Sequence, residues 1–106
     1  MHIFMAYLVK PENTDIFNKI IGLADSGGIY KLNGDLYYQL PSQTIKALNE
    51  CGIKMEVYEA RDSIIKGISL NSKLEKISVG SLPEIPVFME EEHEEFKKSL
   101  KRILNI

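Results

Sequence analysis

A long apolar segment near the start of the sequence constrains the fold more than any other feature. Residues 2–9, HIFMAYLV, are apolar at nearly every position and do not alternate with polar residues. Such a run is typical of a strand that is covered on both faces, as in a parallel sheet between layers of helices. Residues 11–28 follow with helical spacing, and Asn13 or Thr14 can cap that helix. A central strand followed by a helix is therefore predicted.

The same alternation of strand-like and helix-like segments continues along the chain. Strands are predicted at residues 28–32, 53–58 and 74–79, and helices at residues 42–51 and from residue 61 onward. This order predicts one α/β domain over residues 1–106, in three layers. A mostly parallel sheet of four or five strands, flanked by helices as in flavodoxin-like folds, is expected.

Two segments leave an alternative open. The Asn-Gly pair at residues 33–34 is a hairpin signal, so residues 35–40 could return as a strand. We favour a loop and a helical turn there instead. Residues 81–88 contain Pro83 and Pro86, which exclude a regular central strand but allow a short extended piece at an edge.

The C-terminal segment predicts a helix over about residues 89–105. Its first turns are acidic and its last turns are basic, which complements the helix dipole. The apolar positions recur at intervals of three and four residues, at Met89, His93, Phe96, Leu100 and Ile103. This stripe predicts a helix that covers the sheet, and a seam between copies of the chain is the alternative.

Composition limits the classes of function. The chain has 106 residues, 44% of them hydrophobic, and a formal charge of -2 without a basic stripe, so nucleic-acid binding is not expected. The first apolar segment is too short for a membrane span and lacks the features of a signal peptide, so a cytoplasmic protein without membrane contact is expected. One cysteine and two histidines predict no disulfide and no metal site, and the absence of both common phosphate-binding motifs predicts no nucleotide cofactor.

Cys51 and the histidines are the residue types that most often carry chemistry. Cys51 lies at the end of a predicted helix, where the dipole disfavours a thiolate, so a packing role is predicted for it. His2 and His93 are predicted to be packing residues as well, because nothing near them in the sequence completes a catalytic set. Cys51 is kept as an alternative nucleophile.

The segment YEARD, residues 58–62, is the strongest candidate for a site. A strand is predicted to end there and a helix to begin, so the backbone amides and Arg61 could hold an anion. The side chain of Glu59 or Asp62 could cap the same amides instead. Further candidates follow the neighbouring predicted strand, at Asp35, Tyr37 and Tyr38. They wall the same crevice if the first three strands are adjacent, and are ordinary surface and core residues otherwise.

Two short motifs resemble the DsrE/DsrF/DsrH family, also called the YchN-like or TusBCD sulfur-relay family. The segment GDLYYQL is similar to the G-D-x-V-Y loop of the family, at Gly34, Asp35 and Tyr38. The close of the third predicted helix is similar to its R-G-[ILV] motif, at Lys66, Gly67 and Ile68. The resemblance covers roughly residues 1–80, and the C-terminal helix departs from the final strand that is common in the family.

The resemblance implies a cytoplasmic oligomer that handles sulfur, either a trimer or hexamer of one chain or an assembly with sister DsrE-like subunits. Sulfur-carrying members have a cysteine at the end of the third strand, and counting back from Gly67 places Glu59 at that position. The implied function is a subunit without the carrier cysteine, a binding or assembly component and not an enzyme. The alternatives are a sulfurtransferase that uses Cys51 and a protein that binds a small anion at Arg61.

Overall fold

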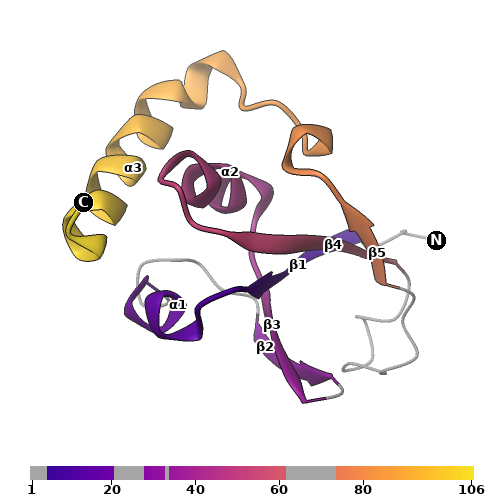
Figure 1. The fold of residues 1–106 in the computed structure, drawn as a ribbon. Helices are drawn as coiled ribbons and strands as arrows, with labels where there is room; N and C mark the ends of the chain where they lie inside the picture. The colour runs from indigo at the N-terminus through magenta and orange to yellow at the C-terminus, as the bar shows by residue number, and fades with distance from the viewer. Residues whose placement is uncertain (1–4, 21–27, 33, 62–73) are drawn as a thin grey trace.

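The computed structural model describes residues 5–20, 28–32, 34–61 and 74–106 (Figure 1). Their strands and helices are, in chain order, β1 (Met5–Pro11), α1 (Thr14–Ile20), β2 (Gly28–Leu32), β3 (Asp35–Gln39), α2 (Ser42–Glu50), β4 (Met55–Arg61), β5 (Leu74–Ile77) and α3 (Glu90–Leu104). Two 3-10 turns, Val79–Ser81 and Val87–Met89, connect β5 to α3. Within the described residues, the predicted strands and the first, second and C-terminal predicted helices are confirmed.

The sheet has the strand order β2-β3-β1-β4-β5, and every neighbouring pair is antiparallel. The predicted mostly parallel, flavodoxin-like sheet is therefore wrong. The error begins at residues 35–39, where we favoured a loop and a helical turn: they form β3, which pairs with β2 along its whole length. Because β3 turns back beside β2 and also fits against β1, neighbouring strands run in opposite directions. From β1 to β4 the element order is that of the ferredoxin-like, split βαβ motif.

The described helices pack on one face of the sheet. Side chains of α1, α2 and α3 form a single buried cluster with strand residues, among them Val9 of β1, Ile45 of α2 and Leu100 of α3. A second, smaller cluster contains strand residues only: Leu8, Tyr37 and Ala60, with Tyr30, Tyr58 and Leu74 packed against them. The described residues thus form two layers, a sheet and its helices, and not the three layers that were predicted.

Local sequence signals set the ends of the first two helices. Asn13 caps α1, since its Oδ1 accepts the backbone N–H of Asp15 at 3.0 Å and of Ile16 at 3.4 Å. The end of α2 is followed by Gly52, whose φ of 84° lies in the left-handed region that favours glycine. This turn reverses the chain, so that β4 can enter the sheet beneath α2.

The C-terminal helix α3 lies on the outside of the helical layer and contacts both α1 and α2 (Figure 1). Most of the predicted apolar stripe faces this layer: Leu100 is fully buried and Phe96 packs against the same core, whereas Ile103 is 38% exposed. Of the two predicted roles for the stripe, covering the fold is the one that these contacts support. The position of α3 also brings its first turns beside α2, where the candidate site lies.

Candidate binding site between α2 and α3

The residues predicted to wall one crevice lie on opposite faces of the sheet. Side chains alternate along β3, so Asp35 and Tyr37 point to the face without described helices, whereas Tyr38 points into the helical core and is 1% exposed. In β4, Glu59 follows the same alternation as Val57, which belongs to that helical core. The structure therefore does not bring these candidates together, and Gly34 lies in the exposed turn before β3.

The predicted start of a helix at residues 60–61 is also wrong. The strand β4 continues through Arg61, and Ala60 pairs with β1 on one side and with β5 on the other. The backbone that was expected to open a helix therefore belongs to the sheet. The helix predicted after it, with the motif at Lys66, Gly67 and Ile68, falls in residues 62–73 and lies outside the described residues.

The sheet face that carries Tyr30, Tyr37 and Tyr58 is called the tyrosine face below. Its charged groups pair with one another: Lys10 Nζ lies 3.2 Å from Asp35 Oδ2, and Lys76 Nζ lies 3.6 Å from Glu56 Oε1. The Tyr58 hydroxyl donates to Glu56 Oε2 at 2.6 Å, and this hydrogen bond, together with burial, raises the pKa of Tyr58 to about 12. The polar groups of this face are thus largely engaged with each other.

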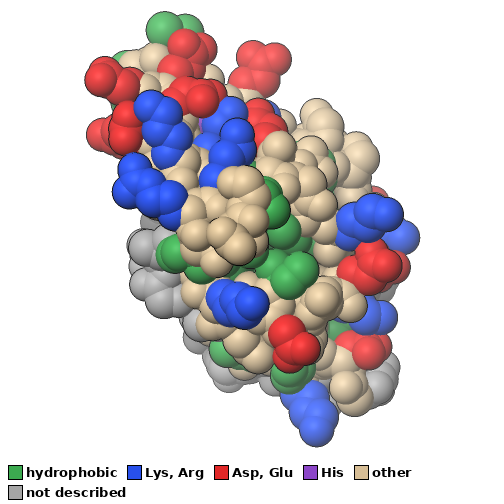
Figure 2. All heavy atoms as spheres, turned by 60° about the vertical axis from the view of Figure 1, so that its left-hand side comes forward, with side chains coloured by type: hydrophobic (Ala, Val, Ile, Leu, Met, Phe, Trp, Pro, Cys, Tyr) green, Lys and Arg blue, Asp and Glu red, His purple; other side chains and the backbone are tan. Residues whose placement is uncertain are grey.

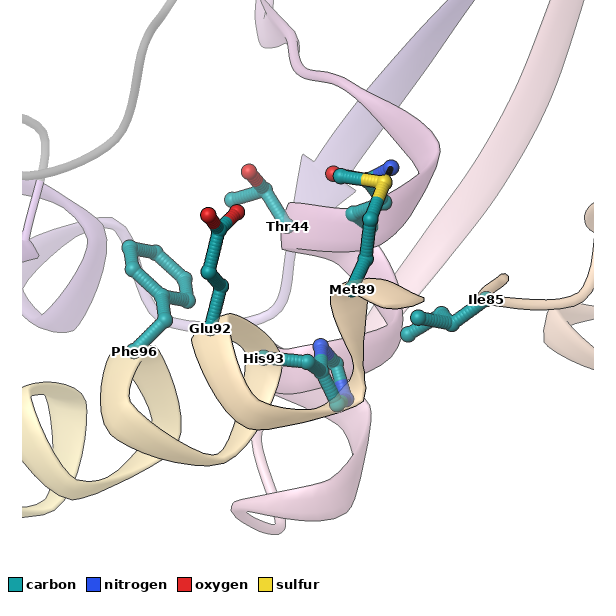
Figure 3. A pocket seen from close by; sticks show the side chains of 7 residues that line it. Thr44, Ile85, Met89, Glu92, His93 and Phe96 are labelled. Carbon is teal, nitrogen blue, oxygen red and sulfur yellow. Dashed lines mark hydrogen bonds between the residues drawn. The ribbon is translucent and has the colours of Figure 1, made fainter. Parts of the chain in front are cut away.

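A cavity of ≈ 240 Å³ lies between α2 and α3, lined by Gln43, Thr44, Ile85, Met89, Glu92, His93 and Phe96 (Figure 3). The first turn of α2 supplies an amide and a hydroxyl, and the first turns of α3 supply a carboxylate, an imidazole and a phenyl ring. Apolar walls with a few polar groups of different kinds are typical of sites for small molecules. This cavity is therefore our candidate functional site.

Contacts between α2 and the start of α3 set the shape of the cavity. Gln43 Nε2 donates to Met89 Sδ at 3.2 Å and so links the first turn of α2 to the beginning of α3. Thr44 is 8% exposed and lines the same cavity. In Figure 3 the side chains of Glu92 and Phe96 extend from α3 toward the side of Thr44, and the ring of His93 extends toward α2.

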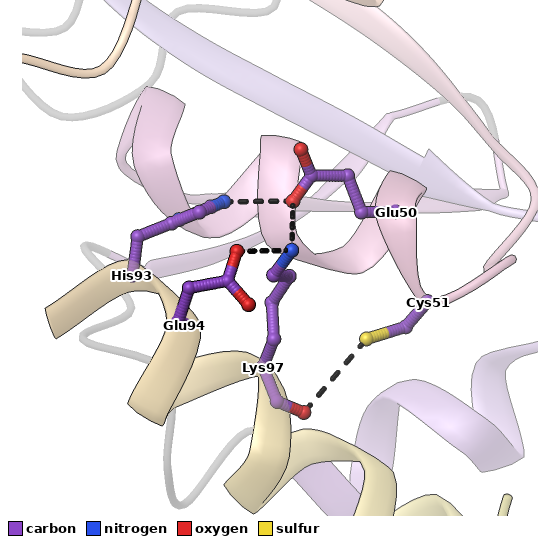
Figure 4. Close-up of polar contacts among 5 residues, drawn as sticks. All are labelled: Glu50, Cys51, His93, Glu94 and Lys97. Atoms are coloured by element: carbon purple, nitrogen blue, oxygen red, sulfur yellow. Dashed lines mark hydrogen bonds and ion pairs between the residues drawn. The ribbon is translucent and has the colours of Figure 1, made fainter. Parts of the chain in front are cut away.

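His93 connects the cavity to a cluster of charges at the end of α2 (Figure 4). His93 Nε2 lies 2.7 Å from Glu50 Oε2, and Lys97 Nζ lies 3.2 Å from the same oxygen and 2.7 Å from Glu94 Oε1. The side chain of His93 is 10% exposed. An ionised carboxylate only accepts hydrogen bonds, so Nε2 is the donor, and Nδ1 of the neutral ring is left as an acceptor.

The charges of this cluster stabilise one another. Burial opposes the ionisation of Glu50, but hydrogen bonds from His93 and Lys97 outweigh it and hold the pKa of Glu50 below 4.5. The hydrogen bond to Glu94, followed by the one to Glu50, raises the pKa of Lys97. At neutral pH, Glu50 is therefore a charged acceptor for His93, and Lys97 is balanced by two carboxylates.

Cys51 follows Glu50 in the sequence but does not line the cavity. Its Sγ lies 4.0 Å from the backbone oxygen of Lys97, its side chain is 8% exposed, and burial raises the pKa of the thiol. These features agree with the packing role that was predicted for it. His93 was also predicted to be a packing residue, but it has a carboxylate partner 43 positions away in the sequence. The one sequence signal for it is a polar residue within an apolar stripe.

No protein-family model matches this sequence, and neither a characterised protein nor a solved structure shows significant similarity to it. The resemblance to DsrE-like proteins stays a prediction that depends on two short motifs. No helix in the described part of the chain is long and apolar enough to cross a membrane. Within the same residues, no three side chains of His, Cys, Asp or Glu come together as a set of metal ligands.

Proposed function

We propose that this chain binds a small organic amine in the cavity between α2 and α3. The observation that carries the proposal is the hydrogen bond of 2.7 Å between His93 and Glu50. It fixes the proton of the neutral ring on Nε2, and no hydrogen bond from the described residues engages Nδ1. A ring that lines the cavity with an acceptor nitrogen favours a ligand that donates hydrogen bonds.

The charges around the cavity favour a cation over an anion. Glu92 lines the cavity, and all three residues of the first turn of α3 are glutamates, which offset the positive end of the helix dipole. The lysine of the charge cluster, Lys97, already contacts Glu50 and Glu94. The local potential is therefore negative, and an ammonium group would be attracted by it.

The remaining walls favour an apolar body on that ammonium group. Ile85, Met89 and Phe96 supply hydrophobic surface, a methionine adapts to irregular shapes, and the face of an aromatic ring attracts cations. The volume of ≈ 240 Å³ is smaller than the roughly 300–1,000 Å³ of pockets for drug-sized ligands. An alkylamine or arylalkylamine of a few carbon atoms fits these limits.

The sulfur-relay roles remain alternative proposals. A carrier role for Cys51 requires a reactive thiolate, whereas burial raises the pKa of this thiol. Binding of an anion at Arg61 requires free backbone amides, whereas the backbone there is part of β4. An assembly role beside DsrE-like subunits predicts no ligand in the cavity, so a ligand test separates it from the amine proposal.

The proposal is tested with three probes that share one carbon skeleton: isopentylamine, isopentanol and isovalerate. We expect the amine to bind with a dissociation constant of about 1 mM, because six non-hydrogen atoms can contribute roughly 4 kcal/mol. The alcohol should bind several-fold more weakly, and the carboxylate should not bind measurably. Chemical-shift titration of the labelled protein measures all three and identifies the residues that respond.

Two variants and one matched control locate the binding site. His93→Phe should weaken amine binding by about tenfold and Glu92→Gln by about threefold, the sizes typical of a lost acceptor and of an exposed charge. Glu91→Gln removes the same charge from the same turn of α3 without lining the cavity, so its affinity should stay within about twofold of wild type. Equal affinity for amine and carboxylate, or equal losses in Glu91→Gln and Glu92→Gln, would contradict the proposal.

A further inference from the structure

Large hydrophobic side chains that remain exposed gather at the two ends of α3. Val87 and Phe88 at its start are 81% and 83% exposed, and Ile103 and Ile106 at its end are 38% and 68% exposed. Among the described residues, the other two exposed side chains of this kind lie in β2 and β3. Single exposed hydrophobic residues are common, but two adjacent ones that are more than four-fifths exposed are typical of a contact surface.

The charges of α3 are separated along the same helix. Its N-terminal half carries Glu90, Glu91, Glu92, Glu94 and Glu95, and its C-terminal half carries Lys97, Lys98, Lys101 and Arg102. Figure 2 shows acidic side chains at the upper end of the molecule and basic side chains below them. Each half of α3 is thus complementary to the other half of an identical helix that runs in the opposite direction.

One side of α3 has a spacing that reads the same in both directions. Glu92, Glu95, Ser99 and Arg102 are separated by three, four and three residues, so they share one side of the helix. Phe88, in the 3-10 turn before α3, lies four positions before this set, and Ile106, after the left-handed Asn105 that ends α3, lies four positions after it. These two residues flank the set in the sequence but are not part of the helix. If two copies of α3 ran antiparallel with their two-fold axis between Glu95 and Ser99, each of the four residues would therefore lie opposite another residue of the set.

We propose that a second copy of this chain packs antiparallel against this side of α3. In that arrangement Phe88 meets the partner's Ile106, Glu92 meets the partner's Arg102, and Glu95 meets the partner's Ser99. The exposed apolar residue at each end is covered by the one at the opposite end of the other helix. Glu95 keeps its own ion pair with Lys98, whose Nζ lies 3.4 Å away.

The charge pattern selects the orientation and the occupant. A parallel pair would place glutamates against glutamates, which is unfavourable, whereas the two-fold pair satisfies both halves of the helix at once. A purely basic or purely acidic partner would complement only one half. The helix has 15 residues and is therefore about 22 Å long. An interface of this length is small beside the roughly 800 Å² per partner of stable complexes, so the dimer should be weak, with a dissociation constant of about 100 μM.

Sedimentation equilibrium of the full chain between about 10 and 500 μM tests the association. The weight-average mass should rise from 12.1 kDa toward twice that value over this range. A single mass of 12.1 kDa at every concentration would overturn the proposal. A trimer or hexamer would overturn it too, because a two-fold helix pair closes with two copies.

A charge exchange between two variants tests the pairing itself. Glu92→Arg and Arg102→Glu each place like charges opposite each other in a homodimer, so each variant alone should be monomeric at about 500 μM. Mixed in equal amounts, they restore both opposite-charge contacts, and the mass should return to that of the wild-type dimer. Lys101→Glu is the control. It makes the same charge change as Arg102→Glu at the preceding residue, which does not belong to this side of α3, so this variant should dimerise as wild type does. Failure of the mixture to associate would exclude this pairing.

The dimer does not depend on the amine proposal. Glu92 lies at both surfaces, but Phe88, Arg102 and Ile106 do not line the cavity. The variant Phe88→Asp should abolish dimerisation while it leaves amine binding within about twofold of wild type, since the change adds a charge outside the cavity. Loss of amine binding with an unchanged dimer would count against the cavity alone, and the reverse result would count against the pairing alone.

Discussion

The two faces of the sheet use polar groups in different ways. On the tyrosine face, hydroxyl groups donate to neighbouring side chains: Tyr58 to Glu56 at 2.6 Å and Tyr30 to Gln39 at 3.0 Å. On the helical side, Glu50 binds His93 through one ring nitrogen, and the same ring lines the cavity of ≈ 240 Å³. On the tyrosine face, Lys10 and Glu56 also line a cavity, of ≈ 400 Å³, but Lys10 is paired with Asp35, and Glu56 is paired with Tyr58 and Lys76. On the helical side, the imidazole that lines the cavity has one ring nitrogen paired with Glu50.

The difference follows from the geometry of the elements. Neighbouring antiparallel strands hold side chains at fixed, short separations, so polar groups on the tyrosine face can pair directly across the sheet. The helices α2 and α3 pack through Leu100, Phe96 and other core residues, and a cavity remains between their first turns. A ligand-binding role is therefore better supported on the helical side than on the tyrosine face.

The largest effect is expected from Leu100→Ala, a truncation in the helical core. Leu100 is 0% exposed and fixes α3 to the core, so truncation should lower the free energy of unfolding by about 3 kcal/mol. Because α3 supplies Glu92, His93 and Phe96 to the cavity, amine binding should fall as well. Urea unfolding and the chemical-shift titration measure the two consequences.

Leu8→Ala is the matched truncation on the tyrosine face. Leu8 is 6% exposed, and its loss should cost about 2 kcal/mol while the affinity for the amine stays the same. If Leu8→Ala weakened the amine as much as Leu100→Ala does, the two faces would not be independent.

The sequence predicts the elements of this fold well and their arrangement poorly. Helical spacing and end signals located α1, α2 and α3, and apolar runs located four of the strands. The continuous apolar run at residues 2–9 was interpreted as the centre of a parallel sheet. Leu8 at 6% and Val9 at 0% exposure do lie in a strand buried on both faces, but a central antiparallel strand meets the same condition. The apolar run therefore predicts that the strand is buried, but it does not predict the direction of the neighbouring strands.

The decisive signal was the Asn-Gly pair before residues 35–39. It is a recognised hairpin signal, and the tyrosines after it are favourable in strands, but the helical alternative was preferred. For the site, the limit is physical: Glu50 and His93 are 43 positions apart, and only the packing of α3 on α2 brings them together. The predicted site at Glu59 and Arg61 required a helix start where the chain continues as β4.

A smaller effect, which depends on pH, is expected from Glu50→Gln. The folded pKa of Glu50 lies below 4.5, so its ion pairs stabilise the fold above about pH 4.5 and lose that contribution as the pH falls through the folded value. Since 47% of this side chain is exposed, Glu50→Gln should cost only about 0.5 kcal/mol at pH 7. The difference from wild type should shrink as the pH falls through the folded pKa of Glu50. A constant difference from pH 7 to pH 3 would mean that the charge of Glu50 does not stabilise the fold.

The smallest effect on stability is expected on the tyrosine face, from Glu56→Gln. The pKa of Tyr58 is raised to about 12 in the folded chain, above the ordinary value of 10.0, so its hydrogen bond stabilises the fold below pH 10 and loses that contribution as the pH rises toward 12. In wild type the Tyr58 ring should therefore remain un-ionised at pH 11. In Glu56→Gln the amide still accepts a hydrogen bond from the hydroxyl, but the negative charge is gone, and the ring should ionise closer to pH 10.

Ring resonances of labelled tyrosine, assigned with Tyr58→Phe, follow this group alone. Glu75→Gln, in the neighbouring strand β5 but on the other face of the sheet, is the control and should leave Tyr58 unchanged. If Tyr58 of the wild type ionised near pH 10, the hydroxyl would not be held by Glu56, and the tyrosine face would be as open to a ligand as the cavity is.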